Sequence, residues 1–293
     1  MISENGVPTI SFLSDYGTAD EFVGVVHSVI RSISPAIPIV DITHNIEPFN
    51  VRAGSLALAR SAAYLMPGVV LAVVDPGVGT DRRPILVEVG DGQSYLVGPD
   101  NGLLAPTVAL VGGATAAWHL TNTDYHLDSV GGGTFDGRDI FAPVAAHLCA
   151  GVPPSSLGEA VDPVSLMPGL LPVSEVGADG AIEAEVLWVD RFGNVQINVE
   201  PSQINHWDEL YSVTTERTTT VACRSETYAR IGAGVGVVTD SQGLVSLAVD
   251  RGSAAEELGL VEGDRVTLAA ADQPSGVVTP VNLGRTVNRP GER

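Results

Sequence analysis

The chain has 293 residues, 44% hydrophobic and 17% charged, so it carries enough apolar material for a large core and is not disordered as a whole. Its formal net charge is −20, and a surface that acidic repels phosphate backbones, which argues against nucleic-acid binding. All 15 basic residues are arginine, so mechanisms that need a lysine nucleophile, base or phosphate ligand are excluded.

Apolar runs that end in polar residues alternate with amphipathic stretches through the first half of the chain. The run "GVVLAVVD" (68–75) is so apolar that its strand is expected to be covered on both faces. This alternation predicts an α/β domain with a mostly parallel sheet, in which ligands bind beyond the carboxyl ends of the strands. Strands are expected at 9–15, 37–43, 68–75, 84–90 and 94–100, and helices at 21–32, 51–65 and 138–151.

The second half of the chain has a different texture, beginning with the proline- and glycine-rich stretch 151–172. Beyond it come short β-branched runs with glycine turns and no long helix, which predict a small antiparallel β-barrel. Its strands are expected within 181–190, 194–199, 211–224, 234–240, 244–250 and 264–270. The domains are expected to be an α/β domain over 1–163, a connector over 164–180, a β-barrel over 181–271 and a polar tail over 272–293.

The sequence shows no common targeting signal and no common metal-binding motif. The amino terminus lacks a signal peptide, and no apolar run approaches the ~20 residues of a membrane helix, so we expect a cytoplasmic protein that contacts no membrane. Cys149 and Cys223 stand far apart, and the six histidines show no metal-ligand spacing. We therefore expect no metal site.

Loops dense in Asp, Gly and Asn follow many of the predicted strands. Any one of them fits a simple turn, because these residues favour turns. Together they place several carboxylates at strand ends, where a carboxylate can accept the two hydroxyls of a ribose and a cluster of acids attracts a cation. The residues alone thus predict a ribose-bearing, partly cationic small-molecule ligand. The loops are "SDYGTADEF" (14–22), "VVDPGVGTDRR" (73–83), "GPDNGLL" (98–104), "TFDGRD" (134–139), "DRFGN" (190–194) and "DSQG" (240–243).

In this order, the first five motifs closely resemble those of the S-adenosylmethionine hydroxide adenosyltransferases, relatives of the fluorinase and chlorinase. The resemblance covers about residues 8–270. It implies a homotrimer in which S-adenosylmethionine lies between the α/β domain of one subunit and the β-barrel of its neighbour. It also implies the reaction: water or hydroxide displaces methionine from the ribose C5′ and adenosine forms. No metal or other cofactor is implied, since the sulfonium is already a good leaving group.

The resemblance implies catalytic roles for Asp75, Arg82 and Asp136. Members of the family hold the attacking water with a triad similar to Asp–Arg–His, and Asp75 and Arg82 match its first two residues. Asp136 stands where the family has histidine. It is expected either to share Arg82 with Asp75 and accept a proton from water, or to turn outward and cap the helix that begins near Arg138.

The family resemblance also implies how the methionine and ribose parts are bound. Asp15 matches the residue that binds the ribose hydroxyls, and Asp20 and Asp190 match those that meet the ammonium group. Ser241 matches a contact to the carboxylate. The fluorinase follows this serine with arginine where the present chain has Gln242, so this contact is expected to differ.

Aromatic and adenine contacts complete the implied site. Phe49 replaces an aromatic residue beside the ligand, and Phe135 matches the wall of the nucleophile pocket. Phe192 and Asn194 match residues that hold the adenine, together with the backbone near Arg251.

Two alternatives stand beside hydrolysis. A halide-using adenosyltransferase would place a halide among carboxylates, which repel it strongly in a pocket of low dielectric constant. The resemblance also implies a difference at this position, because halogenating relatives carry tyrosine where the present chain has Asp75. The second alternative is a binder of S-adenosylmethionine or adenosine that has lost catalysis along with the histidine.

Overall fold

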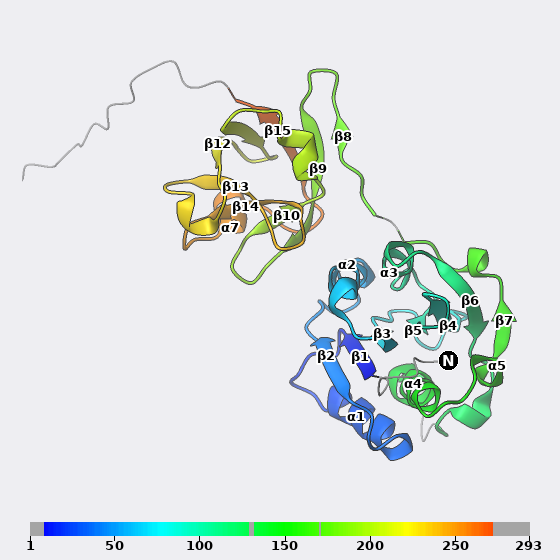
Figure 1. Ribbon diagram of the computed structural model, residues 1–293. Coiled ribbons are helices and arrows are strands. Elements are labelled where there is room, and N and C mark those ends of the chain that lie inside the picture. The colour runs from blue at the N-terminus through cyan, green and yellow to red at the C-terminus, as the bar shows by residue number, and fades with distance from the viewer. Residues whose placement is uncertain (1–8, 129–131, 170, 272–293) are drawn as a thin grey trace, which may run out of the picture. The chain divides into compact units, whose positions relative to one another are not determined.

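The computed structural model describes residues 9–128, 132–169 and 171–271. They form two compact units that divide between Val173 and Ser174 (Figure 1). This division falls inside the stretch 164–180 that the sequence predicts as a connector. The tail predicted over 272–293 lies outside the described residues.

The amino-terminal unit contains a seven-stranded sheet in the order β2-β1-β3-β5-β4-β6-β7. Strands β2, β1, β3 and β5 pair in parallel, and β4 runs antiparallel to both β5 and β6. Strand β6 therefore has the direction of β5, and only β4 and β7 oppose the rest. The prediction of a mostly parallel sheet is confirmed. The strands are β1 (Thr9–Ser14), β2 (Ile39–Thr43), β3 (Gly68–Val73), β4 (Pro84–Val89), β5 (Ser94–Pro99), β6 (Ala114–His119) and β7 (Glu159–Val161).

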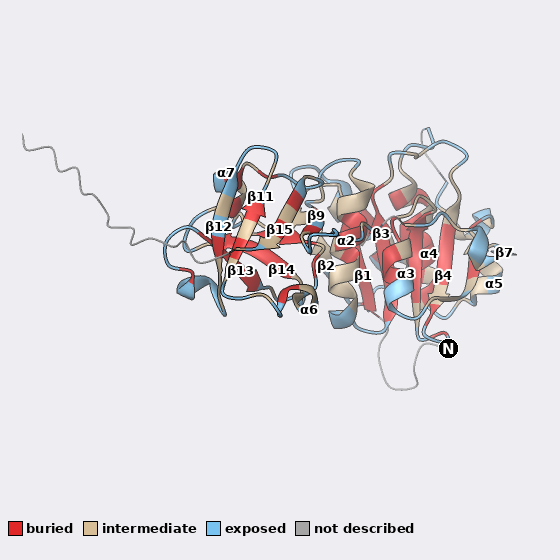
Figure 2. Cartoon of the chain, turned by 90° about the horizontal axis from the view of Figure 1, so that it is seen from above, coloured by how far each residue is buried: buried red, intermediate tan, exposed pale blue. Residues whose placement is uncertain are grey.

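Helices cover both faces of this sheet (Figures 1 and 2). Strand β3 shows why, because Val69, Leu71 and Val73 pack into the cluster with α1 and α4, whereas Val70 and Ala72 join the cluster on the opposite face. A strand with apolar residues on both faces must be buried on both, as the sequence predicts. The helices are α1 (Phe22–Ile33), α2 (Val51–Ser61), α3 (Ala105–Leu110), α4 (Ala142–Cys149), α5 (Pro154–Leu157), the π-helix η3 (Gly137–Phe141) and the 3₁₀ turns η1 (Ala62–Tyr64), η2 (Thr123–Tyr125) and η4 (Pro163–Ser165).

The carboxyl-terminal unit is a closed β-barrel. Seven strands follow the order β10-β14-β13-β12-β11-β15-β9, and β10 also pairs with β9, which closes the ring and leaves no free edge. All these pairings are antiparallel except β12 with β13, a short parallel contact allowed by the looped segment that contains η5 (Tyr228–Arg230). The predicted barrel is thus confirmed, with that one exception to antiparallel pairing.

The barrel core is filled by inward-facing apolar side chains, with Tyr211 the largest among those fully buried. Its strands are β9 (Ile182–Val189), β10 (Val195–Ile197), β11 (Leu210–Thr214), β12 (Thr219–Arg224), β13 (Val235–Thr239), β14 (Val245–Val249) and β15 (Arg265–Ala270). Strand β8 (Glu175–Val176) forms a hairpin with β9, and α6 (Pro201–Ile204) and α7 (Ala254–Leu258) are short surface helices.

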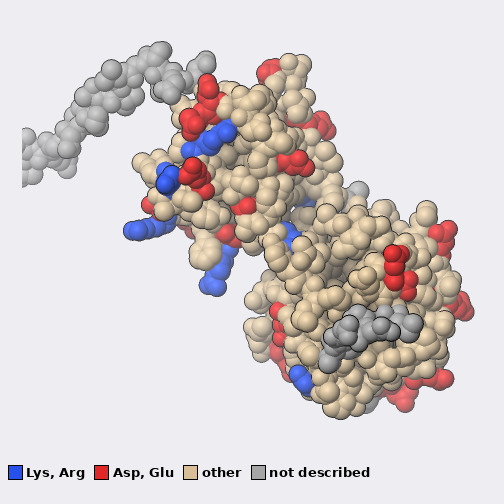
Figure 3. All heavy atoms as spheres, in the orientation of Figure 1, with Lys and Arg blue, Asp and Glu red and all other residues tan. Residues whose placement is uncertain are grey.

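The surface reflects the acidic composition. On the face drawn in Figure 3, carboxylates are spread over both units, and most of the visible arginines lie on the carboxyl-terminal unit. Within the described residues, no helix is both long and apolar enough to cross a membrane.

Candidate active site

The ends of two neighbouring parallel strands place two carboxylates side by side. Asp15 directly follows β1, and Asp75 comes two residues after β3. Strands β1 and β3 pair in register up to Ser14 and Val73, and the Asp15 N–H donates to the Val73 carbonyl at 3.3 Å. Both carboxylates therefore reach one cavity at the carboxyl edge of the sheet, as the strand pattern predicts.

The cavity measures about 790 Å³ and lies in the amino-terminal unit. Of the residues proposed from the sequence it is lined by Asp15, Asp20, Phe49, Asp75, Phe135 and Asp136. Other side chains that line the cavity were not predicted as site residues; they include Tyr16, Phe22, Thr134 and Arg138.

Arg82 bridges two carboxylates at this cavity. Its Nε donates to Asp75 Oδ1 at 3.0 Å, and its Nη2 donates both to Asp75 Oδ2 and, at 2.6 Å, to Asp136 Oδ2. The side chains are 8%, 6% and 16% exposed for Arg82, Asp75 and Asp136 respectively, so the charges are largely withdrawn from water. Asp136 directly precedes η3, but its side chain makes no capping hydrogen bond. The structure thus favours the shared arginine over the capping interpretation.

The electrostatics of Asp75 follow from this arrangement. Burial raises the pKa of Asp75, the charge and hydrogen bonds of Arg82 lower it, and the charge of Asp136 raises it again, with a net increase. Two carboxylates share one guanidinium, so the cluster carries a net negative charge when all three groups are ionised. Asp75 accepts two bonds from the arginine. Among the described residues no donor reaches Asp136 Oδ1, which leaves this oxygen available to a ligand in the cavity.

Asp15 is held in place by the backbone of the loop that carries Phe49. The Phe49 N–H donates to Asp15 Oδ2 at 2.9 Å, and Phe49 adopts the left-handed conformation with φ +69°. Asn50 then caps α2 by accepting from the Ala53 N–H, which fixes where the helix begins. The Phe49 ring is left 71% exposed at the edge of the cavity. Left-handed conformations of bulky residues are costly and tend to cluster at functional sites.

An aromatic wall forms one side of the cavity. The rings of Tyr16, Phe22 and Phe135 meet one another at centroid distances between 5.2 and 5.8 Å. Burial, and then the charges of Asp15 and the two carboxylates on Arg82, raise the pKa of Tyr16 far above its usual range, so its hydroxyl stays protonated. This hydroxyl packs against Gly137, where an added Cβ would lie 2.0 Å from it. Tyr16 lies inside the "SDYG" motif next to Asp15, and this position is the sequence signal that points to it as a site residue.

Four carboxylates thus line the cavity: those of Asp15, Asp20, Asp75 and Asp136. Arg138, the arginine among the described lining residues, is paired with Asp139 through two hydrogen bonds of 2.6 and 2.9 Å. The arrangement creates a negative potential that favours a cationic ligand.

The other proposed residues lie on turns of the barrel. Asp190 organises the turn after β9: its Oδ1 accepts from the N–H groups of Phe192 and Asn194 at 2.9 Å, and its Oδ2 from the Asn194 side chain at 2.8 Å. Asp190 therefore holds this turn, and it leaves the Phe192 ring 71% exposed.

The remaining two barrel residues occupy opposite ends of β14. Arg251 follows β14 in a left-handed conformation, φ +54°, and the next segment contacts the 190–194 turn through the Ala255 N–H, which donates to the Gly193 carbonyl at 3.0 Å. Ser241 lies in the exposed turn that precedes β14. The structure thus groups the Arg251 segment with Asp190, Phe192 and Asn194 but places Ser241 at the other end of the strand.

Family models match both units of the chain. The SAM hydroxide adenosyltransferase N-terminal domain model matches residues 10–158, and the corresponding C-terminal domain model matches residues 184–267. The chain belongs to the SAM hydroxide adenosyltransferase family. Its two matched regions coincide with the α/β unit and the barrel.

Several similar proteins have a known function name or a known structure. A protein of Salinispora tropica, 46% identical over 90% of this chain and 98% of its own length, is named (R)-S-adenosyl-L-methionine hydrolase. One from Thermus thermophilus with the same name is 37% identical over 88% of this chain and 98% of its own. A protein of Actinopolyspora mzabensis, named fluorinase, is 29% identical over 87% and 95%. The crystal structure of an uncharacterized conserved protein from Thermotoga maritima superposes with a TM-score of 0.82 at 34% identity, covering 89% of this chain and all of that one.

Proposed function

We propose that this chain hydrolyses S-adenosyl-L-methionine to adenosine and L-methionine. The observation that carries the proposal is the buried Arg82 shared by Asp75 and Asp136 at a carboxylate-lined cavity. It is supported by the 46% identity, over almost the whole chain, to a protein named (R)-S-adenosyl-L-methionine hydrolase.

The charges of the cavity match those of the substrate. S-adenosylmethionine carries a sulfonium and an ammonium group, and the four cavity carboxylates favour both over a neutral or anionic ligand. Asp15, whose Oδ2 is held by the Phe49 N–H, presents its Oδ1 to the ribose hydroxyls, and the exposed Asp20 reaches the ammonium. Phe49 and Phe135 supply apolar contacts beside the ligand and the nucleophile.

Hydrolysis proceeds by in-line displacement. The water oxygen forms a bond to the ribose C5′ while the C5′–S bond breaks, and the sulfur takes the electron pair and leaves as the neutral thioether of methionine. Asp136 accepts the proton that the water loses, through the carboxylate oxygen not bound to Arg82. Arg82 and Asp75 hold Asp136 in place, so positioning and local charge supply most of the acceleration. The sulfonium is a good leaving group, and the proposed reaction uses no cofactor.

The same charges argue against a halide as nucleophile. A halide beside Asp75 and Asp136 meets two negative charges and only one guanidinium, and these three side chains are largely withdrawn from water. A water molecule is neutral, so the carboxylates do not repel it, and it can donate a hydrogen bond to one of them. Hydrolysis therefore fits the site better than halogenation.

Turnover in isotopic water tests the proposal. We expect purified protein with S-adenosylmethionine in H₂¹⁸O to release equal amounts of methionine and adenosine, with ¹⁸O in the 5′-hydroxyl. Added chloride or fluoride should give no 5′-halogenated nucleoside. Saturable binding without adenosine would replace hydrolysis with the non-catalytic alternative, and a halogenated product would replace it with halide transfer.

We further propose a cytoplasmic homotrimer in which the barrel turns of one subunit complete the cavity of another. Support comes from the distribution of the proposed ligand residues over both units, with Asp15 in one and Phe192 in the other. Complementation tests it, because co-expressed Asp15→Ala and Phe192→Ala chains form some sites with both units intact. Asp15→Ala with Asp75→Asn is the matched control, since every site then lacks one amino-terminal residue. Light scattering that shows a fully active monomer would rule the trimer out.

A further inference from the structure

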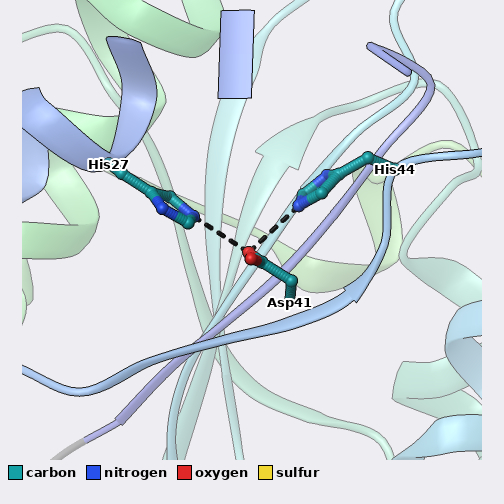
Figure 4. Close-up of side chains that lie close together, drawn as sticks. All are labelled: His27, Asp41 and His44. Carbon is teal, nitrogen blue, oxygen red and sulfur yellow. Dashed lines mark hydrogen bonds and ion pairs between the residues drawn. The ribbon is translucent and has the colours of Figure 1, made fainter. Parts of the chain in front are cut away.

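Three side chains from α1 and from the end of β2 meet beside β1, outside the cavity. His27 comes from α1, Asp41 from β2 and His44 from the segment directly after β2 (Figure 4). Nε2 of His27 lies 2.9 Å and Nε2 of His44 lies 3.0 Å from the same oxygen, Asp41 Oδ1. None of the three lines the cavity described above.

One ring nitrogen of the buried histidine, His44 Nε2, lacks a hydrogen bond of acceptable geometry. His44 is 5% exposed, and its Nδ1 lies 2.8 Å from the Ser14 hydroxyl. Its Nε2 is buried and, among the described residues, has no hydrogen-bond partner of acceptable geometry despite the nearby Asp41 oxygen. If Nδ1 carries the proton and donates to Ser14, a lone pair on Nε2 faces a carboxylate oxygen, which is repulsive. A cation between them removes that repulsion.

We propose that His27, Asp41 and His44 bind a zinc ion. Two imidazole nitrogens and a carboxylate oxygen form a common zinc donor set, with bonds of about 2.0–2.2 Å. In a tetrahedral site such bonds separate neighbouring ligand atoms by roughly 3.3–3.6 Å. The present separations of 2.9 and 3.0 Å from Asp41 Oδ1 therefore need to open by a few tenths of an ångström, and the two imidazole nitrogens, which lie within 4.8 Å of each other, need to reach the same range. His27 and Asp41 are 29% and 43% exposed, so solvent reaches the ion and supplies the remaining ligand.

The surroundings hold the two imidazoles for this role. The Phe12 ring lies 4.6 Å from the His44 ring and 6.1 Å from the His27 ring, which fixes both from the side of the core. Ser14 occupies the outer position that usually orients a metal-bound histidine through its second nitrogen.

The zinc site is connected to the active-site loop by two hydrogen bonds. The Gly17 N–H donates to the His44 carbonyl at 2.7 Å, and the Tyr16 N–H donates to Ser14 Oγ at 3.3 Å. These bonds tie the zinc ligand His44 to the loop that carries Asp15 and Asp20. The ion therefore acts as a structural brace for this loop, and the inference does not depend on the proposed reaction.

Zinc titration of the full chain, first stripped with a chelator, tests the proposal by calorimetry. We expect one zinc ion per chain for the wild type. His27→Ala and Asp41→Asn alter partly exposed side chains, so both variants should fold, and they should weaken zinc binding about 100-fold or more. Ser14→Ala, which removes the outer hydrogen bond, should weaken it about 10-fold. His206→Ala is the matched control, because this exposed histidine lies in the other unit and its loss should leave zinc affinity unchanged.

Two further readouts separate a built site from surface binding. Co²⁺ in place of zinc should give the visible absorption of a four-coordinate site in the wild type and not in His27→Ala. Zinc should also raise the unfolding midpoint of the wild type but not of Asp41→Asn. Equal zinc affinity in wild type, His27→Ala and Asp41→Asn would overturn the proposal, as would a wild type that binds no zinc.

Discussion

Replacing Asp136 by asparagine isolates the charge of one member of the Arg82 cluster. The amide oxygen can still accept from Arg82 Nη2, which now lies 2.6 Å from Asp136 Oδ2, so the side-chain packing is retained. Arg82 keeps both bonds to Asp75, and the cluster becomes electrically neutral. We therefore expect the variant to fold normally, so that changes in rate report on chemistry.

The expected loss of activity follows from the proton that Asp136 accepts. Removing a general base slows catalysis by about 10²-fold at the lower end, which corresponds to about 2.7 kcal/mol of activation free energy. The charge of Asp136 also raises the pKa of Asp75, although burial contributes most. Its removal should lower the pKa of Asp75, so the acid limb of the residual activity should move to lower pH. That shift reports the lost charge of Asp136, whereas the loss of rate reports its role as a base.

Adenosine release measured against pH for the wild type, Asp136→Asn and Asp136→His provides the assay. Asp136→His should retain or raise activity, because histidine can also bind water and orient Arg82. If Asp136→Asn turns over as fast as the wild type, Asp136 only positions Arg82 and the general-base assignment is wrong.

Two more predictions concern the loop after β1 and the start of η3, which packs on it. Asp15→Ala should weaken the binding of S-adenosylmethionine and of adenosine alike, by about 2–3 kcal/mol. Asp20→Ala should weaken only the binding of S-adenosylmethionine, because adenosine lacks the ammonium group. Calorimetry with both ligands checks this, and equal losses of adenosine affinity in the two variants would reject the assignment. Gly137→Ala should cost roughly 1–3 kcal/mol of unfolding free energy, because its Cβ would lie 2.0 Å from the Tyr16 hydroxyl. Gly24→Ala in α1 has open space around it and should not destabilise the protein. Denaturant unfolding compares the two variants, and matching midpoints would show that the start of η3 relaxes freely.

The sequence predicts best the helices and strands whose apolar residues form a clear pattern. The run 68–75 becomes β3 because apolar residues on both faces can only be buried between two helical layers. Strand β6 was not predicted, since "ATAAWH" is rich in alanine and has little β propensity of its own. It forms because it pairs with β4 on one side and β7 on the other, which is a tertiary effect.

The site shows the same division between local and long-range information. Asp15 and Asp75 were predictable from their places at strand ends, and the partnership of Asp136 with Arg82 follows from the family motif. The meeting of His27, Asp41 and His44 was not predictable, because the spacing of the histidines resembles no metal motif. They converge only when α1 packs beside β2, and a single sequence without that packing gives no sign of it.

The end of β1 serves two sites with consecutive residues. Ser14 points toward His44, and Asp15 points into the cavity. Side chains alternate along a strand, so one inserted or deleted residue in β1 would exchange these directions and remove both contacts together. The register of β1 is therefore constrained from two sides at once.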